Sequence, residues 1–268
     1  VACVGGTHHS CERIGEFLQE SRIDCAARGL VCVPERGCTA CIPDLVTCDG
    51  HTVVRCLADG ERMETVQACD YAGGYTCHAG GCVNICAAAQ NERSYMGCEF
   101  YAVDLDNATI SQIHDAARQQ YAVVVSNLQK VPVEVFVEVN TAAFGEPTQV
   151  EQVARTLVPP GGLEIFALPG REVDGSSSEG LNDGTHTALS SNAYRIRSSH
   201  PIIAYQFNPL DNVDVFSNEA SLLIPTSAIE RRYTVVGWPQ TIGDSDEPAE
   251  DFDFTTDDED LRAFLTIV

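Results

Sequence analysis

Twelve of the thirteen cysteines in this 268-residue chain form two copies of one pattern, and all thirteen lie within the first 98 residues. Equivalent members are 44 or 45 residues apart, and a spacing held over six positions indicates an internal repeat. The pattern predicts two tandem modules, residues 1–45 and 46–90, ahead of a body spanning residues 91–268. The first module holds Cys3, Cys11, Cys25, Cys32, Cys38 and Cys41, and the second holds Cys48, Cys56, Cys69, Cys77, Cys82 and Cys86.

Disulfides are the expected use of these twelve cysteines, because a module of this size buries too little apolar surface to fold alone. Each bridge adds roughly 2–4 kcal/mol by restricting the unfolded chain. Six cysteines allow three bridges per module, and we expect none to join one module to the other. The pairing inside each module is left open. Cys98 is left over and is expected to be unpaired in this chain or bonded to an external partner.

Zinc ligation is the alternative interpretation of clustered cysteines. Only Cys38 and Cys41 have the C-x2-C spacing typical of structural zinc sites, and the second copy widens it between Cys82 and Cys86. Disulfides are therefore favoured, and they persist only in an oxidising compartment. The chain is expected to be secreted or displayed at a cell surface.

The charge balance restricts the partners. The chain carries 39 acidic against 16 basic residues, a formal net charge of -23, which repels nucleic acid and anionic membranes. No segment approaches the ~20 consecutive apolar residues of a membrane span, so membrane insertion is not expected.

The body is predicted to be β. Valines at every second position of residues 131–139 share one face, with Glu134, Phe136 and Glu138 on the other, as a half-buried antiparallel strand requires. Further strands are predicted at residues 121–126, 163–168, 194–197 and 202–207, with residues 198–201 as a turn. The expected fold is mostly β: an antiparallel β-sandwich after two small disulfide-rich modules with little regular structure.

Two polar segments, residues 170–184 and 243–260, are predicted to be loops, because the first lacks an apolar period and the second holds ten acids. The chain closes on an apolar strand pattern at residues 263–268. We expect the body to be truncated there.

Catalytic motifs are missing from the sequence. It contains no G-x-S-x-G elbow, H-E-x-x-H pair, P-loop or dinucleotide fingerprint. His114, His186 and His200 are isolated, and His200, ahead of a proline, is interpreted as a turn residue. The chain is therefore not expected to be an enzyme, and no cofactor is expected except calcium.

A calcium site is the one ion-binding hypothesis that the sequence suggests. Asp104, Asp106 and Asn107 alternate hard oxygen ligands of the kind that Ca²⁺ prefers, although the glycine and distal glutamate of an EF-hand are missing. Residues 211–214 form a similar cluster. The alternative is that these side chains cap turns through their own backbone.

Three ordered segments resemble the N-terminal domain of the IgGFc-binding protein family, especially secreted bacterial members of myxobacterial type with cysteine-rich repeats. They are residues 94–107 (SYMGCEFYAVDLDN), 121–127 (YAVVVSN) and 198–229. The resemblance covers about residues 91–268 and implies an extracellular, non-enzymatic recognition or matrix module. No Fc-contact residues can be matched, so antibody binding is not carried over.

The function expected is extracellular recognition, adhesion or a matrix role, with the modules as a stalk and the body contacting a protein or glycan at a cell surface or in a matrix. Exposed aromatic residues anchor such contacts, and Trp238, Phe252 and Phe254 are candidates, although Trp238 suits the core as well. The alternatives are a calcium-dependent carbohydrate-binding module and a structural subunit of a filament or coat. Self-association is left open.

Overall fold

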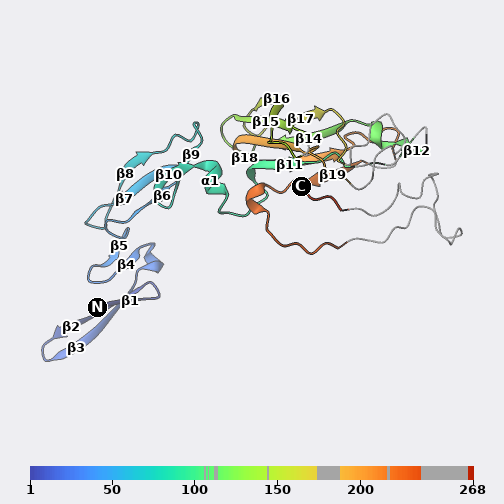
Figure 1. The fold of residues 1–268 in the computed structure, drawn as a ribbon. Helices are drawn as coiled ribbons and strands as arrows, with labels where there is room; N and C mark the ends of the chain where they lie inside the picture. The colour runs from blue at the N-terminus through green and yellow to red at the C-terminus, as the bar shows by residue number, and fades with distance from the viewer. Residues whose placement is uncertain are drawn as a thin grey trace. The chain divides into compact units, whose positions relative to one another are not determined.

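The chain divides into two compact units, Val1–Ala88 and Ala89–Val268. The structure is a computed structural model that describes residues 1–105, 107, 109–111, 114–143, 145–173, 188–215, 218–236 and 265–268. Strands account for most of the regular structure of these residues (Figure 1), so the mostly-β prediction is confirmed. No helix in the described part of the chain is long and apolar enough to cross a bilayer.

The first unit contains two modules built on one plan, a three-stranded antiparallel sheet followed by a two-stranded hairpin. Apart from β2 and β3, which have eight residues each, the strands are short, as expected where disulfides replace part of a core. The first module comprises β1 (Ala2–Val4), β2 (Thr7–Ile14), β3 (Phe17–Asp24), the 3-10 turn Ala26–Arg28, β4 (Val31–Val33) and β5 (Gly37–Thr39). The second comprises β6 (Val46–Asp49), β7 (Thr52–Cys56), β8 (Met63–Ala68), β9 (Tyr75–His78), β10 (Gly81–Asn84) and α1 (Ile85–Ala89).

Two disulfides hold each module in the same way. Cys3–Cys32 and Cys25–Cys38 span 29 and 13 residues in the first module. Cys48–Cys77 and Cys69–Cys82 span the same 29 and 13 residues in the second. In each case the bridges fasten the two-stranded hairpin to the three-stranded sheet.

The third bridge leaves its module, so the expectation of self-contained modules is wrong. Cys41 of the first module bonds to Cys56 of the second. The equal spacing identifies equivalent cysteines but does not say which neighbour each one meets. Neighbouring units of a repeat array pack on each other, and Cys41 follows the last strand of its module toward the next.

The roles predicted for Cys11 and Cys98 are also wrong. Cys11, expected in a disulfide, is free and exposed. Cys98, expected to lack a partner in this chain, is disulfide-bonded, and so is Cys86. Six disulfides lie within residues 3–98.

The second unit is built on a curled seven-stranded antiparallel sheet, and β12 and β13 form a separate two-stranded sheet. The strand order of the seven-stranded sheet is β16-β15-β18-β14-β17, with β11 and β19 also paired to β18. The elements are β11 (Gly97–Ala102), β12 (Thr109–Ser111), β13 (His114–Asp115), the 3-10 turn Ala116–Arg118, β14 (Tyr121–Ser126), β15 (Val133–Asn140), β16 (Val150–Val158), β17 (Leu163–Leu168), β18 (Tyr194–Asn208), β19 (Glu219–Leu222) and the 3-10 turn Thr226–Ala228.

The fifteen-residue strand β18 joins the two halves of this sheet. Its first half pairs with β15 and β11, and its second half pairs with β14 and β19. The turn predicted at residues 198–201 is therefore wrong. Pairing with β15 ends at Ser198 and pairing with β14 begins at Ile203, so Pro201 lies between these ladders, where its missing N–H costs least. His200 continues the strand with only 1% of its surface exposed.

The core lies inside the curl of the sheet. Val133, Val135 and Val137 are fully buried, whereas Glu134 and Phe136 between them are partly exposed, so the predicted alternation along this strand is confirmed. The apolar face closes around large side chains from the other strands. These include Phe100, Tyr121, Val123, Val125, Phe166, Tyr194, Ile196 and Ile202.

Several sequence predictions fall outside the described residues. Trp238, Phe252, Phe254 and the whole of residues 243–260 lie there, as does most of residues 170–184, including the end of the predicted loop. Residues 265–268 are described and carry no strand assignment.

We expect Val135→Ala to destabilise the second unit by about 2 kcal/mol, because it deletes two buried methyl groups and leaves a cavity. The matched control is Val153→Ala on β16, where the side chain is 41% exposed. That change should cost no more than about 0.5 kcal/mol. Denaturant unfolding measures both free energies, and equal costs would contradict the placement of β15.

Candidate ligand-binding face

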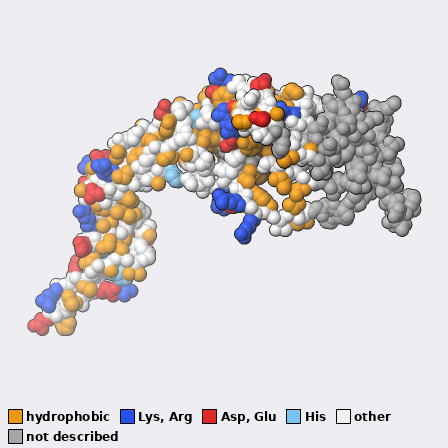
Figure 2. All heavy atoms as spheres, in the orientation of Figure 1, with side chains coloured by type: hydrophobic (Ala, Val, Ile, Leu, Met, Phe, Trp, Pro, Cys, Tyr) orange, Lys and Arg blue, Asp and Glu red, His pale blue; other side chains and the backbone are white. Residues whose placement is uncertain are grey.

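Charged side chains gather on the face of β11, β18 and β15 that points away from the core. Strand register places Arg195 between Tyr101 and Glu138, and Arg197 between Glu99 and Phe136. Because side chains alternate along a strand, all of these lie on one face. Charges of both signs are visible over this end of the sheet (Figure 2).

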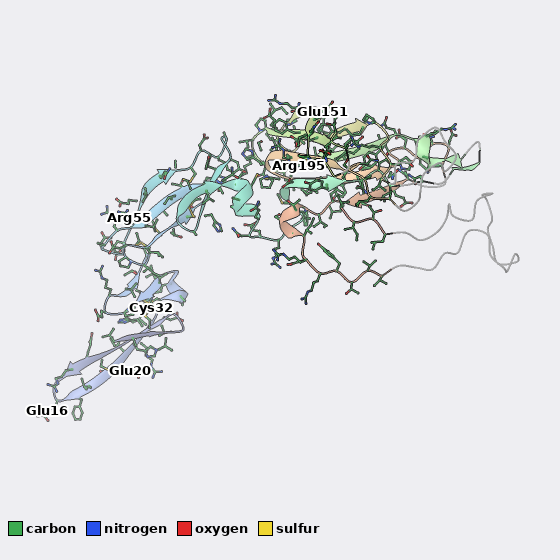
Figure 3. All side chains as sticks on the ribbon, in the orientation of Figure 1. Glu16, Glu20, Cys32, Arg55, Glu151 and Arg195 are labelled. Atoms are coloured by element: carbon green, nitrogen blue, oxygen red, sulfur yellow. A yellow bond between two sulfur atoms is a disulfide. The ribbon has the colours of Figure 1, made fainter. Side chains whose placement is uncertain are left out.

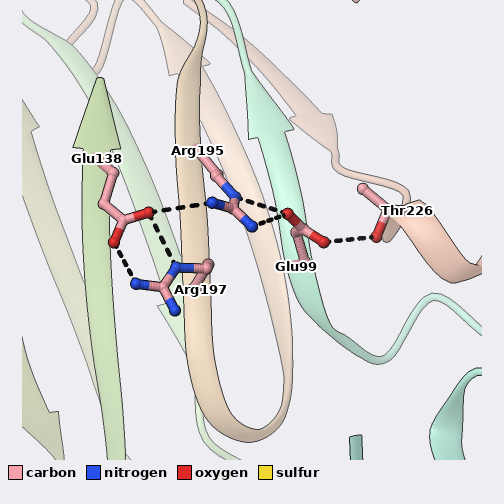
Figure 4. Close-up of polar contacts among 5 residues, drawn as sticks. All are labelled: Glu99, Glu138, Arg195, Arg197 and Thr226. Carbon is pink, nitrogen blue, oxygen red and sulfur yellow. Dashed lines mark hydrogen bonds and ion pairs between the residues drawn. The ribbon is translucent and has the colours of Figure 1, made fainter. Parts of the chain in front are cut away.

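Ion pairs link the charged residues of this face into one network (Figure 4). Nε and Nη2 of Arg195 both lie 2.6 Å from Glu99 Oε1, and Nη1 of Arg195 lies 3.6 Å from Glu138 Oε2. Arg197 donates from Nε to Glu138 Oε2 at 2.9 Å and from Nη2 to Glu138 Oε1. Thr226 Oγ1 donates to Glu99 Oε2 at 3.3 Å, which holds Glu99 in place at one end of the ion-pair network.

Glu138 is the most enclosed member of this network. Its side chain is 6% exposed, whereas that of Arg195 is 35% exposed. The hydrogen bonds from Arg197 hold the pKa of Glu138 below its usual range, although burial acts in the opposite direction. The same pair raises the pKa of Arg197. Both groups are therefore charged at neutral pH, and the two acids balance the two bases.

Phe136 adds an aromatic surface beside the network. The guanidinium carbons of Arg155 and Arg197 lie 5.4 and 5.5 Å from its ring centroid, within the range of cation–π attraction. Arg155 also donates from Nε to Glu134 Oε1 at 2.7 Å. These contacts keep the arginines in place along the strands and extend the ordered face to β16.

A pocket of about 250 Å³ opens beside the network. Its walls come from β11, β15, β18 and the start of β16. The lining residues are Tyr101, Glu138, Val139, Asn140, Thr148, Val150, Ser191, Ala193 and Arg195.

Hydrogen bonds fix the shape of the pocket wall. Asn140 Oδ1 accepts from the backbone N–H groups of Ala142 and Gln149 at 3.1 and 3.0 Å. Arg171 Nη2 donates to the carbonyl oxygens of Asn140 and Ser191 at 2.7 and 3.1 Å, which ties two segments of the wall together. The pocket thus combines an exposed tyrosine, an arginine and short polar side chains on a rigid frame.

Two of the three predicted calcium residues are described, and both make contacts within the protein. Asp104 is 5% exposed, and its Oδ2 accepts from Arg171 N–H at 2.7 Å. Asn107 Nδ2 donates to Asn208 Oδ1 at 2.6 Å and to Leu105 O at 3.2 Å. Asp106 lies outside the described residues. Among those described, no group of three or more His, Cys, Asp or Glu side chains could hold a metal ion.

Asp104 instead influences the tyrosines of the core. Burial is the main cause of the raised pKa of Tyr121 and of Tyr194, which reaches about 12, and the nearby charge of Asp104 adds to both. Tyr121 Oη lies 3.4 Å from Gln206 Oε1, which also accepts the backbone N–H of Val103 at 3.0 Å. The segment around Asp104 is thereby fastened to β18.

Sequence analysis identified none of the network residues as a site. The sequence gives little indication of this network, because Glu99, Glu138 and Arg195 are far apart in the chain and only the strand register brings them together. Alternating charges on strands with apolar opposite faces were the available clue.

No family model, curated protein or solved structure matches this chain. The resemblance to the IgGFc-binding protein N-terminal domain therefore stays a prediction that depends on the three quoted segments.

We expect Glu138→Gln to lower the free energy of unfolding by about 1.5–3 kcal/mol at pH 7, because charged hydrogen bonds to Arg197 are weakened. The folded-state pKa of Glu138 is depressed, so its stabilisation is present above the unfolded value of about 4.3 and is lost as the pH falls through the folded value. The difference in free energy of unfolding between wild type and variant should therefore become smaller as the pH falls from 7 to about 3.

The control is Glu134→Gln on the same strand, whose side chain is 34% exposed and pairs with Arg155. An exposed pair contributes about 0–1 kcal/mol. Denaturant unfolding at both pH values measures the differences. A Glu138→Gln gap that stays constant or widens in acid would contradict the assigned ion pairs.

Proposed function

We propose that this chain is an extracellular, non-enzymatic recognition or adhesion protein. The disulfide-bonded unit serves as a spacer, and the outer face of β11, β18 and β15 contacts a partner. The observation that carries the proposal is the pocket of about 250 Å³ bordered by Tyr101 and the ordered Glu138–Arg195 pair. Both lie on an outer face of the sheet, where a partner has access.

The disulfides support the extracellular setting. Six of them lie within residues 3–98, and bridges at such density persist in an oxidising environment. A net charge of -23 disfavours nucleic acid and anionic membranes as partners, which leaves proteins and uncharged or cationic glycans.

The pocket suits binding of one small group. Its volume is just below the ~300–1,000 Å³ of sites that enclose drug-sized ligands, so it fits one sugar ring or one side chain of a partner protein. Its polar groups are already ordered by ion pairs and backbone hydrogen bonds, so little conformational entropy is lost on binding. Tyr101, 40% exposed, offers the aromatic surface that anchors such contacts.

A calcium-dependent carbohydrate-binding module is the first alternative. It requires an ion site that includes Asp106, because Asp104 and Asn107 are engaged with Arg171 and Asn208. Calcium would then be necessary for glycan binding, whereas the ordered pocket requires none.

A structural subunit of a filament or coat is the second alternative, and a row of apolar side chains on the other half of the sheet favours it. Ile165, Val124, Tyr205 and Leu222 are paired in register across β17, β14, β18 and β19. Ile165, Tyr205 and Leu222 are 51%, 37% and 42% exposed, and Val124 between them is buried at 7%. Exposed apolar rows of this kind mark association surfaces.

We expect Tyr101→Ala to weaken partner binding about tenfold or more, the factor that corresponds to loss of one anchoring contact. The full chain is screened on a glycan array, with and without calcium, and against proteins extracted from the native surface. Tyr75→Ala in the first unit, where the side chain is 47% exposed, should leave binding unchanged.

Three outcomes separate the alternatives. Glycan binding that disappears without calcium supports the carbohydrate module. Binding that is lost in Tyr205→Ala and retained in Tyr101→Ala moves the interface to the apolar row. Long regular assemblies of the purified chain, without binding of glycan or protein, overturn the recognition proposal in favour of a structural subunit.

A further inference from the structure

Cys11 is equivalent to Cys56 of the second module, which forms the disulfide between modules. The offset of 45 residues pairs Cys11 with Cys56, just as it pairs Cys41 with Cys86. Cys56 is bonded to Cys41 of the preceding module and is fully buried. Cys11 is the one cysteine of the chain that is free, and it is exposed.

The bridge at Cys56 is part of a larger docking contact. The backbone N–H groups of Ala40 and Cys41 donate to Gly60 O at 2.8 and 3.1 Å. Asp44 N–H donates to Cys56 O at 3.0 Å, and Cys56 N–H donates to Leu45 O at 2.9 Å. The tail of the first module, residues 39–45, thus lies along the turn between β7 and β8.

Gly60 fits closely beneath this tail. A Cβ added there would lie 2.9 Å from Thr39 Cγ2, so only glycine permits the approach. Its φ of +77° also favours glycine. Thr39 itself is buried and donates from Oγ1 to Cys41 O at 2.8 Å, which orders the tail for its bridge.

The equivalent hairpin of the first module has no tail on it, and its turn is tighter, because Ile14 pairs with Phe17 whereas Cys56 pairs with Met63. Gly15, the equivalent of Gly60, has a φ of +66° and nothing within 4 Å of an added Cβ. Every residue from Cys11 to Glu20 is exposed, and Glu16 lies at the tip of the hairpin (Figure 3). Three apolar side chains lie open on it: Ile14 at 59%, Phe17 at 80% and Leu18 at 71% exposure.

We propose that the β2–β3 hairpin is the docking site for the tail of a further module of this kind. The tail's cysteine, equivalent to Cys41 and Cys86, bonds to Cys11 Sγ. The backbone of the tail pairs with the backbone of Cys11, as residues 44 and 45 pair with Cys56. The bond between modules therefore repeats along the array, and the first module retains an open acceptor.

The chemistry is a two-electron oxidation of two thiols. The Cys11 and tail thiols lose two protons and two electrons as the S–S bond forms. A small-molecule disulfide such as oxidised glutathione accepts the electrons and leaves as two thiols, through a mixed-disulfide intermediate. The docked tail selects which thiol Cys11 meets.

The direct test adds a second copy of residues 1–45 ahead of Val1. The added Cys41 then precedes Cys11 by fifteen residues, the separation found in Cys41–Cys56. The extended chain is refolded in a glutathione redox buffer, alkylated without reduction and mapped by mass spectrometry. We expect a bridge between the added Cys41 and Cys11, with the single free thiol moved to the Cys11 of the added copy.

The matched control carries Cys41→Ser in the added copy only. Cys11 should then be alkylated together with its added equivalent, giving two free thiols. Two results overturn the proposal: alkylation of Cys11 in the extended chain whose other bridges have formed, and a Cys11–Cys11 dimer in place of the predicted bridge.

A second measurement needs no folding of an added module. A peptide of residues 39–45 carrying its cysteine as a glutathione mixed disulfide is mixed with the intact 268-residue chain. Docking predicts that it reacts with Cys11 about tenfold faster than a scrambled peptide of the same composition, the factor given by ~1.4 kcal/mol of binding. Equal rates for the two peptides contradict the docking site.

Discussion

The disulfide between Cys41 and Cys56 is the constraint on which the first unit depends. The two internal bridges of a module fasten its own hairpin to its own sheet. They do nothing to fix one module against the next. The third bridge does, together with four backbone hydrogen bonds between residues 40–45 and residues 56–60. The repeat is therefore joined covalently to its neighbour, and its units are not independent.

In the second unit, strand pairing holds segments that are distant in sequence together, with no disulfide between the described strands of the sheet. β18 is long enough to pair with β15 and β11 through its first half and with β14 and β19 through its second. Its inward side chains fill the core, and its outward arginines, Arg195 and Arg197, complete the ion-pair network. One strand thus sets both the fold and the geometry of the pocket, which is why the proposed binding face is rigid.

Local pattern was enough to predict some of this. The alternating valines of β15 predicted a strand with one buried face, and the cysteine repeat predicted two modules of one plan. Other features depend on contacts that no local pattern carries. The partner of Cys41 and the free thiol of Cys11 follow from how modules pack, and equal spacing is compatible with bonding inside or between modules. The sequence from Ser198 to Pro201 is typical of a turn, and only its pairing with strands on either side shows that it continues β18. The Glu99–Arg195–Glu138 chain requires the order of three strands that are distant in sequence.

Non-reducing peptide mapping of the intact 268-residue chain tests the account most directly. The disulfides predict a cross-linked peptide pair containing Cys41 and Cys56, no alkylation of Cys86 or Cys98 before reduction, and alkylation without reduction at Cys11 alone. A chain in which Cys41 bonds to a cysteine of its own module, or in which Cys98 is alkylated and Cys11 is not, would contradict it.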